Sequence, residues 1–327
     1  MLIESGVRFI QTCKAPDKFH EQRNTLMAFK RLLLIMLLSI TTNAASANRF
    51  DHMIWDGLLR EYVYMINQKQ ASQVNYYGLA LNHGQLQKYL SQLSAVKKSD
   101  FADWDQSEQL AFLINAYNAF TVEMILRSYS SIATLRAYAP VTLSWKSRLI
   151  SMMKNQRELE FISLLGELLS LNEIENEMIR KPGNYNEPRI HFALNRASIG
   201  CPALLNRAYT GMELEQQLET ATRAFLSDRS RNRVNEEAEK LEVSEIFDWY
   251  REDFERGWRR WSGLAQFFAH YRDSLTDTPR ARKLLASENA EIQFIEFDWM
   301  LNEKNNVTTT DANSLLRFVL TMFTKPM

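Results

Sequence analysis

The chain has 327 residues, of which 46% are hydrophobic and 24% are charged, as in an ordinary globular protein. Its 39 basic and 39 acidic residues balance, so the composition shows neither the basic excess typical of nucleic-acid-binding proteins nor an acidic tail. The 7 Trp, 12 Tyr and 18 Phe residues supply enough bulk for one large core.

The N-terminal segment has the pattern of a secretory signal. Two basic residues precede the apolar run 32–40, and the small residues Ala45–Ala47 follow it. This order predicts a signal peptide over residues 1–47 with cleavage after Ala47, and Met27 is an alternative start of translation. The run is shorter than the roughly 18 apolar residues of a membrane-spanning helix. We therefore expect a periplasmic or secreted protein that has no transmembrane span after cleavage.

The first half of the mature chain has mainly helical apolar spacing. We expect, in chain order, a helix at 55–67, a strand or turn at 74–78, and helices at 82–93, 107–126 and 164–179. The helix that Ser107 caps is apolar on almost every side, which is typical of the central helix of a core.

The second half mixes short strands with helices. We expect a strand at 190–194, a helix from 202 to 211, a helix at 214–226, a strand at 241–243, helices after Ser244 and around 258–268, and a strand at 292–299. The first strand carries His191, and Pro202 favours a helix start that makes Cys201 its N-cap. No repeat or linker divides the chain. The sequence thus predicts one α+β, predominantly helical domain over residues 50–302, with a C-terminal tail at 303–327.

Several of these segments together resemble the uncharacterised family known as domain of unknown function 547. The matching segments, in the family's order, are residues 111–120, 190–195, 197–202, 243–250 with Asp253 and Phe254, and 297–299. The resemblance implies a predominantly helical, exported bacterial domain, with relatives in plants and no assigned reaction. Relatives often carry a second cysteine where this chain has Arg196, so a family site that needs two thiols is in doubt here.

Cys201 and His191 form the first candidate site. Signal cleavage would remove Cys13 and leave Cys201 as the only thiol, which cannot form an internal disulfide. A sulfur near a helix N-terminus and an imidazole tends to ionise and become nucleophilic. The alternatives are a packed cysteine with a structural histidine, or a metal or ligand contact.

Asn115 and Asn118 form the second candidate site, because two amides three residues apart share one face of the apolar central helix. Buried amides must find hydrogen-bond partners. They could orient His191 or donate to an oxyanion. The alternative is that they bond to a neighbouring loop and fix its path.

Asp248, close to Asp253, is a third candidate, since a carboxylate could complete a Cys-His-Asp arrangement. The alternative is a structural salt bridge, for example to an arginine of the cluster Arg229, Arg231 and Arg233. That cluster could itself bind an anionic envelope polymer, or form a solvated or salt-bridged surface.

Two functions follow from these candidates. The first is a thiol-dependent hydrolase or acyl transferase acting on an envelope peptide or amide, with Cys201 as nucleophile, His191 as base, and Asn115, Asn118 or Asp248 as the orienting group. The second is a non-catalytic envelope module, in which the same residues form a polar pocket for a peptide or small molecule or stabilise the fold. The sequence has no zinc signature, phosphate-binding glycine loop or Gly-x-Ser-x-Gly motif, so we expect no cofactor or metal.

Overall fold

A computed structural model describes the backbone of residues 49–137 and 145–304, and the side chains of 49–129 and 150–304. The predicted signal peptide, and the predicted tail beyond its first two residues, lie outside this range. Phe50 and the described residues after it fall into one unit. None of the helices in this part of the chain combines the length and apolar composition that a membrane crossing requires.

The predicted α+β, predominantly helical fold is confirmed. The α-helices are α2 (Met53–Tyr62), α3 (Tyr76–Leu81), α4 (His83–Ser94), α5 (Lys98–Ala102), α6 (Gln106–Ala137), α7 (Trp145–Gln156), α8 (Leu171–Glu173), α9 (Leu214–Leu226), α10 (Ile246–Trp249), α11 (Arg251–Glu255), α12 (Leu264–His270), α13 (Arg272–Leu275) and α14 (Pro279–Ala286). The strands are β1 (Val63–Ile66), β2 (Ala71–Val74), β3 (Ile162–Leu164), β4 (Glu167–Leu169), β5 (Arg233–Asn235), β6 (Lys240–Ser244) and β7 (Glu291–Ile295). Short 3-10 helices lie at Asn67–Lys69, Pro188–Phe192 and Trp258–Arg260, and a π-helix at Ile174–Ile179.

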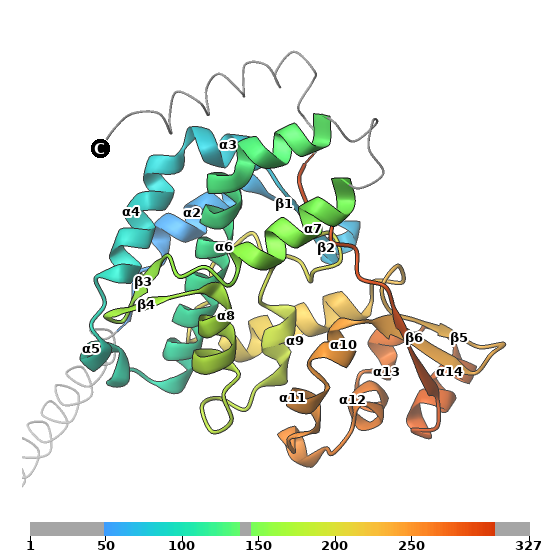
Figure 1. Cartoon of the computed structure of the whole chain (residues 1–327). Helices are drawn as coiled ribbons and strands as arrows, with labels where there is room; N and C mark the ends of the chain where they lie inside the picture. The colour runs from blue at the N-terminus through green and yellow to red at the C-terminus, as the bar shows by residue number, and fades with distance from the viewer. Residues whose placement is uncertain (1–48, 138–144, 305–327) are drawn as a thin grey trace, which may run out of the picture. The chain divides into compact units, whose positions relative to one another are not determined.

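The first hydrophobic core forms around α6. Every side chain of α6 from Leu110 to Leu126 is buried, which confirms its predicted central place. Helices α3, α4 and α7 pack against it, and α2 packs in turn on α3 and α4 (Figure 1). A helix covered on all sides has no polar face to expose, and this explains why its apolar residues follow no single stripe.

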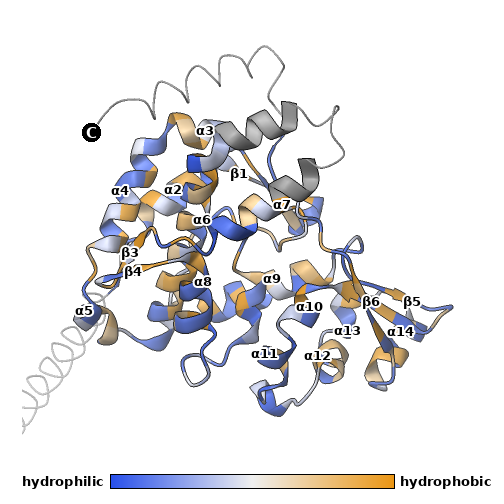
Figure 2. Cartoon of the chain, in the orientation of Figure 1, coloured by the Kyte–Doolittle hydropathy of each residue, from blue (hydrophilic) through white to orange (hydrophobic). Residues whose placement is uncertain are grey.

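The second core is aromatic and joins α9 to the elements that follow it. Its rings come from Phe192, Phe225, Phe247, Phe254 and Phe267, with neighbouring centroids 4.9–6.4 Å apart. Figure 2 shows the contrast between the hydrophobic α12, which packs into this core, and the hydrophilic α11 beside it. Residues 190–201 lie where the cores meet, since Ile190 and Leu194 belong to the first and Phe192 and Cys201 to the second.

The small sheets tie distant segments together. β1 and β2 form an antiparallel hairpin, β3 and β4 form another, and β6 pairs antiparallel with β5 and parallel with β7. After β7 the chain returns to the first half of the protein, where Leu301 pairs with Ser198 and Glu303 with Val74. This returning segment forms one side of the cavity described below.

Several of the predicted elements differ from the structure in their bounds or type; the strand or turn expected at 74–78, for example, is the end of β2 and the start of α3. The helix expected at 55–67 ends at Tyr62, where β1 begins. The stretch 164–179 becomes helical only from Leu171, because Leu165 and Gly166 take positive φ angles of 52° and 82° and turn the chain into the β3–β4 hairpin. The strand expected at 292–299 ends at Ile295. By contrast, α9 has the predicted bounds.

The predicted strand that carries His191 is wrong. Pro188 fixes the backbone for a helical turn, and the Glu187 side chain accepts a hydrogen bond from the Arg189 N–H at 3.0 Å, so a 3-10 helix forms. Ile190, His191 and Phe192 are all buried, so no exposed face interrupts the apolar pattern. A short buried run of this kind looks the same in a strand and in a helical turn.

Candidate functional site

The two asparagines of α6 bind the backbone of the loop that follows His191. The Asn115 side chain donates to the Tyr209 carbonyl at 2.8 Å and accepts from the Tyr209 N–H at 3.0 Å. In the same way Asn118 donates to the Ala193 carbonyl and accepts from the Asn195 N–H, both at 2.9 Å. Each amide thus satisfies one donor and one acceptor of buried backbone, as the loop-fixing alternative predicts.

The helix expected from Pro202 to Gly211 does not form, so Cys201 is not a helix N-cap. Backbone groups of this segment bond instead to side chains from elsewhere in the chain. The Leu204 N–H donates to Ser72 Oγ at 2.8 Å, and the Pro202 carbonyl accepts from the Asn195 side chain at 2.7 Å. These partners replace the regular bonds of a helix.

Cys201 is buried, with an exposed fraction of 2%, and is a free thiol. Its sulfur accepts a hydrogen bond from the Arg196 backbone N–H at 3.2 Å. Within the described part of the chain, no hydrogen bond joins this sulfur to His191. Burial raises the pKa of the thiol, and the Arg196 charge offsets this only in part. The thiol is therefore neutral at pH 7, unlike an activated nucleophile.

His191 is fully buried and pairs with Asp253. Its Nε2 lies 2.6 Å from Asp253 Oδ2, and the Tyr250 ring stacks on the imidazole with centroids 4.0 Å apart. Nδ1 has no hydrogen-bond partner among the residues that the structure describes. Burial lowers the pKa of His191 to about 4, although the carboxylate works in the opposite direction. Burial acts to raise the pKa of Asp253, but the bonds from His191 and Arg180 lower it overall.

Asp248 lies on α10 with its side chain 53% exposed, and its ion pair is with Arg251 at 3.7 Å. The carboxylate that binds His191 is therefore its neighbour Asp253, which also accepts from Arg180 Nε at 2.6 Å. The two arginine contacts of Asp253, from Arg180 and Arg256, fix it as part of a charged network.

A second buried network lies next to His191. Glu175 and Arg196, each 1% exposed, form an ion pair of 2.5 Å, and Arg157 donates to the other Glu175 oxygen at 2.7 Å. Arg196 also donates to the Tyr250 hydroxyl at 2.8 Å. Burial alone would raise the pKa of Glu175, but the charges of Arg196 and Arg157 hold it well below its usual range.

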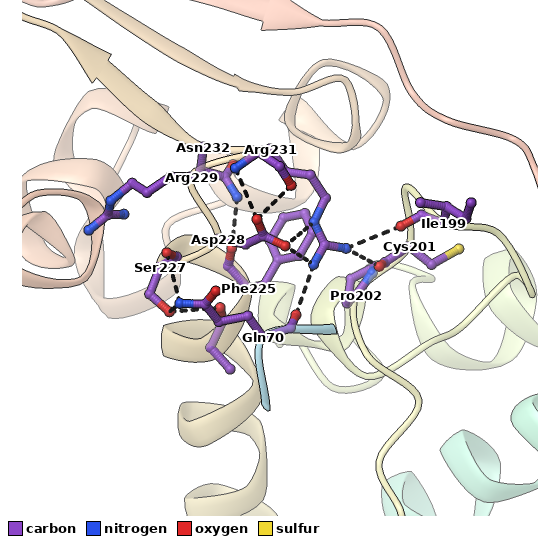
Figure 3. Close-up of polar contacts among 12 residues, drawn as sticks. Gln70, Ile199, Cys201, Pro202, Phe225, Ser227, Asp228, Arg229, Arg231 and Asn232 are labelled. Atoms are coloured by element: carbon purple, nitrogen blue, oxygen red, sulfur yellow. Dashed lines mark hydrogen bonds and ion pairs between the residues drawn. The ribbon is translucent and has the colours of Figure 1, made fainter. Parts of the chain in front are cut away.

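Arg231 joins three segments that are far apart in the sequence, as Figure 3 shows. Its guanidinium donates to the carbonyls of Gln70 and Cys201 and forms an ion pair with Asp228. In Figure 3 the Cys201 carbonyl points toward this guanidinium while its sulfur points away. Arg229 and Arg233 pair with Asp277 and Glu242, so all three members of the arginine cluster are salt-bridged.

A cavity of about 540 Å³ lies beside the loop that contains Ile199 and Gly200. Its walls come from the β1–β2 hairpin, Ile199 and Gly200, the turn with Asp228 and Arg231, and the returning segment 295–303. Gly200 allows the close approach, because a Cβ there would lie 2.9 Å from both the Asp298 nitrogen and the Phe297 ring. Neither Cys201 nor His191 lines the cavity.

The charged groups of the cavity lining are mainly acidic. It contains four carboxylates, those of Asp228, Glu296, Asp298 and Glu303, and a single guanidinium, that of Arg231. Arg231 neutralises Asp228, whereas Glu296 and Asp298 are exposed and form no ion pair with another described residue. The described residues contain no group of three His, Cys, Asp or Glu side chains that could hold a metal ion.

Sequence reasoning missed Glu175, Arg157, Glu296 and Asp298 as parts of the buried network and the cavity. Charged residues are usually exposed, and nothing in the local pattern marks Glu175 as an exception. The alternation of acidic and apolar residues from Ile295 to Trp299 was a usable signal, because it places Glu296 and Asp298 on one side of an extended segment.

Replacing Asn118 by Ala should destabilise the protein by about 2–4 kcal/mol, because the Ala193 carbonyl and the Asn195 N–H lose their partners. Chemical denaturation measures this change. The exposed Asn155 on α7 is the control, and Asn155→Ala should change the free energy of unfolding by less than about 0.5 kcal/mol. Equal effects of the two substitutions would contradict the assignment.

Cys201 should resist iodoacetamide at pH 7 in the native protein and react fully after denaturation, since its thiol is buried and its pKa raised. Mass spectrometry of the Cys201 peptide distinguishes it from Cys13. Rapid native labelling that slows in His191→Gln would instead indicate an activated thiol and contradict this account.

Stability should fall as the pH drops from about 6.5 toward 4, because the unfolded chain takes up a proton on His191 that the folded protein excludes. Above about pH 6.5, the neutral imidazole therefore makes its full contribution to stability. His191→Gln should reduce the slope by up to about 1.4 kcal/mol per pH unit. Burial also lowers the pKa of His52 to about 4. The stability of the His191→Gln variant should therefore still fall as the pH drops, with a smaller slope. An NMR titration showing His191 protonated at pH 6 would contradict the prediction.

The comparisons with known proteins agree with the sequence resemblance. A family model described as "protein of unknown function, DUF547" matches residues 101–226. This range includes α6, His191, Cys201 and α9, while the resembling segments at 243–250 and 297–299 lie beyond it. No curated protein and no solved structure matches the chain. The chain therefore resembles this family of unknown function over residues 101–226.

Proposed function

We propose that the protein is exported to the bacterial envelope and binds there a short peptide that presents a primary ammonium group. The acidic 540 Å³ cavity is the observation that carries this proposal. Its volume is within the range of small-molecule sites. The signal-like N-terminus supports export, with the mature chain beginning after Ala47.

The cavity's two kinds of lining suit such a peptide. Glu296 and Asp298 supply unneutralised carboxylates for an ammonium group, while Ile199, Phe297 and Met300 supply apolar surface for a side chain. Two carboxylates in the same cavity add their negative potentials and so attract a cation. The ligand's charge and its apolar part are thus both recognised.

The polar residues around Cys201 support binding rather than thiol catalysis. Asn115 and Asn118 are occupied by backbone groups, the Cys201 sulfur by the Arg196 N–H, and His191 Nε2 by Asp253. In this proposal they hold the loop that forms one cavity wall, as the non-catalytic alternative requires.

Trialanine with a free N-terminus should bind at least tenfold more tightly than N-acetyl-trialanine, measured by calorimetry. The combined substitutions Glu296→Gln and Asp298→Asn should remove this preference, which corresponds to about 1.4 kcal/mol. The control combines Glu237→Gln with Glu288→Gln, two exposed acids outside the cavity, and should keep it. Equal affinity for both peptides, or no binding of either, would refute the proposal.

Secretion is tested separately. N-terminal sequencing of the protein from the envelope fraction should begin at or near Asn48. Recovery of an intact N-terminus in the cytoplasm would contradict export without bearing on the cavity.

A further inference from the structure

A second cavity, of about 300 Å³, lies beside α9. One stripe of the helix lines it, with lining residues from Glu213 to Phe225 that recur every three or four positions. Twelve residues of helix span about 18 Å, so the cavity follows the helix for more than three turns. The opposite wall comes from Met65, Phe192 and the loop 203–207.

The lining of this cavity is mixed, because seven of its 15 residues are apolar and the rest are polar or charged. Two of the apolar residues, Phe192 and Phe225, are buried and lie next to each other with ring centroids 5.3 Å apart. Ala203, Ala221 and Ala224 line it as well, and their short side chains leave the space unfilled. The apolar part of this lining offers surface for a flexible hydrocarbon or a similar apolar group.

The rim carries one cation that no acid neutralises. Arg207 pairs with Glu213, but Lys69 is exposed and forms no ion pair with any residue in the described part of the chain. Lys69 ends a run of three non-glycine residues with positive φ, 49° at Asn67, 55° at Gln68 and 72° at Lys69. Such strain is typical of binding sites and persists only where surrounding contacts impose it.

Hydrogen bonds of Gln70 connect the lining of this cavity with the lining of the acidic cavity. Gln70 follows the strained turn, and its carbonyl accepts from Arg231 at 2.8 Å while its side chain donates to the Ser227 carbonyl at 3.1 Å (Figure 3). The hairpin turn and the loop after residue 198 each contribute residues to both cavities, whereas Arg231 lines only the acidic one. The two cavities are therefore distinct sites with opposite charge at their rims.

We propose that the 300 Å³ cavity binds a medium-chain carboxylic acid, whose hydrocarbon tail lies along α9 over Phe192 and Phe225 and whose carboxylate pairs with Lys69. This site does not depend on the proposed peptide site. A lysine at the rim of an apolar cavity selects an anionic head group, because a neutral head group gains no charge interaction there.

Calorimetry on the full chain, with decanoate and decanol below their aggregation concentrations, tests the proposal. Decanoate should bind at least fivefold more tightly than decanol, and Lys69→Met should remove this difference. Lys88→Met is the matched control, since Lys88 is also exposed without an ion pair among the described residues, and it should leave the difference intact. Ala224→Leu, which fills the cavity from α9, should weaken both ligands at least tenfold.

Circular dichroism verifies that each variant is folded. If Ala224→Leu does not fold, the comparison of Lys69→Met with the wild type still tests the proposal. Glu296→Gln with Asp298→Asn should leave decanoate affinity unchanged, which separates the two cavities. Absence of saturable decanoate binding would overturn the proposal. So would equal affinity for decanoate and decanol, or a Lys69→Met variant that binds decanoate like the wild type.

Discussion

Residues 193–211 are mostly buried but form no helix or named strand, and the rest of the structure depends on how their backbone is satisfied. An unpaired buried N–H or carbonyl group costs free energy comparable to a lost hydrogen bond, so each one needs a partner. Side chains supply those partners: Asn115, Asn118, Asn195, Ser72, Asp56, Gln217 and Arg231 all bond to this stretch. These seven polar side chains are therefore structural requirements of one loop.

This constraint also supports the non-catalytic function that we propose. A catalytic thiol needs a lowered pKa and a base that contacts its sulfur, whereas burial raises the pKa of Cys201 and its sulfur bonds to the Arg196 N–H. The buried charges of Glu175 and Arg196 are likewise paired inside the protein. The loop contributes residues to two cavities, and these are where we place ligands.

Periodicity in the sequence was enough to predict the helical framework. α6 was predictable from its long, almost entirely apolar run, and the amphipathic α9 from more than two turns of consistent spacing. Asn115 and Asn118 were also recognisable, since two amides in an apolar helix must have partners. Their partners, backbone groups 75–94 residues away, depend on a loop path that has no periodic signal.

Other features lay beyond sequence reasoning for specific reasons. Asp253 and Asp248 are both carboxylates in the same short region, and only the break between α10 and α11 turns Asp253 toward His191. Pro202 follows Cys201 as it would at a helix start, but the Arg231 bond to the Cys201 carbonyl and the Ser72 bond to Leu204 favour an irregular path. Such competition between local preference and distant partners is set by the tertiary structure.

Amide hydrogen exchange of residues 193–211 in the native protein tests the central claim most directly. Side-chain hydrogen bonds and burial should protect the N–H groups of Asn195, Leu204 and Tyr209 to an extent comparable with α6, although this stretch has no regular secondary structure. Exchange of these amides at the rate of an unstructured chain, with α6 protected, would contradict the account.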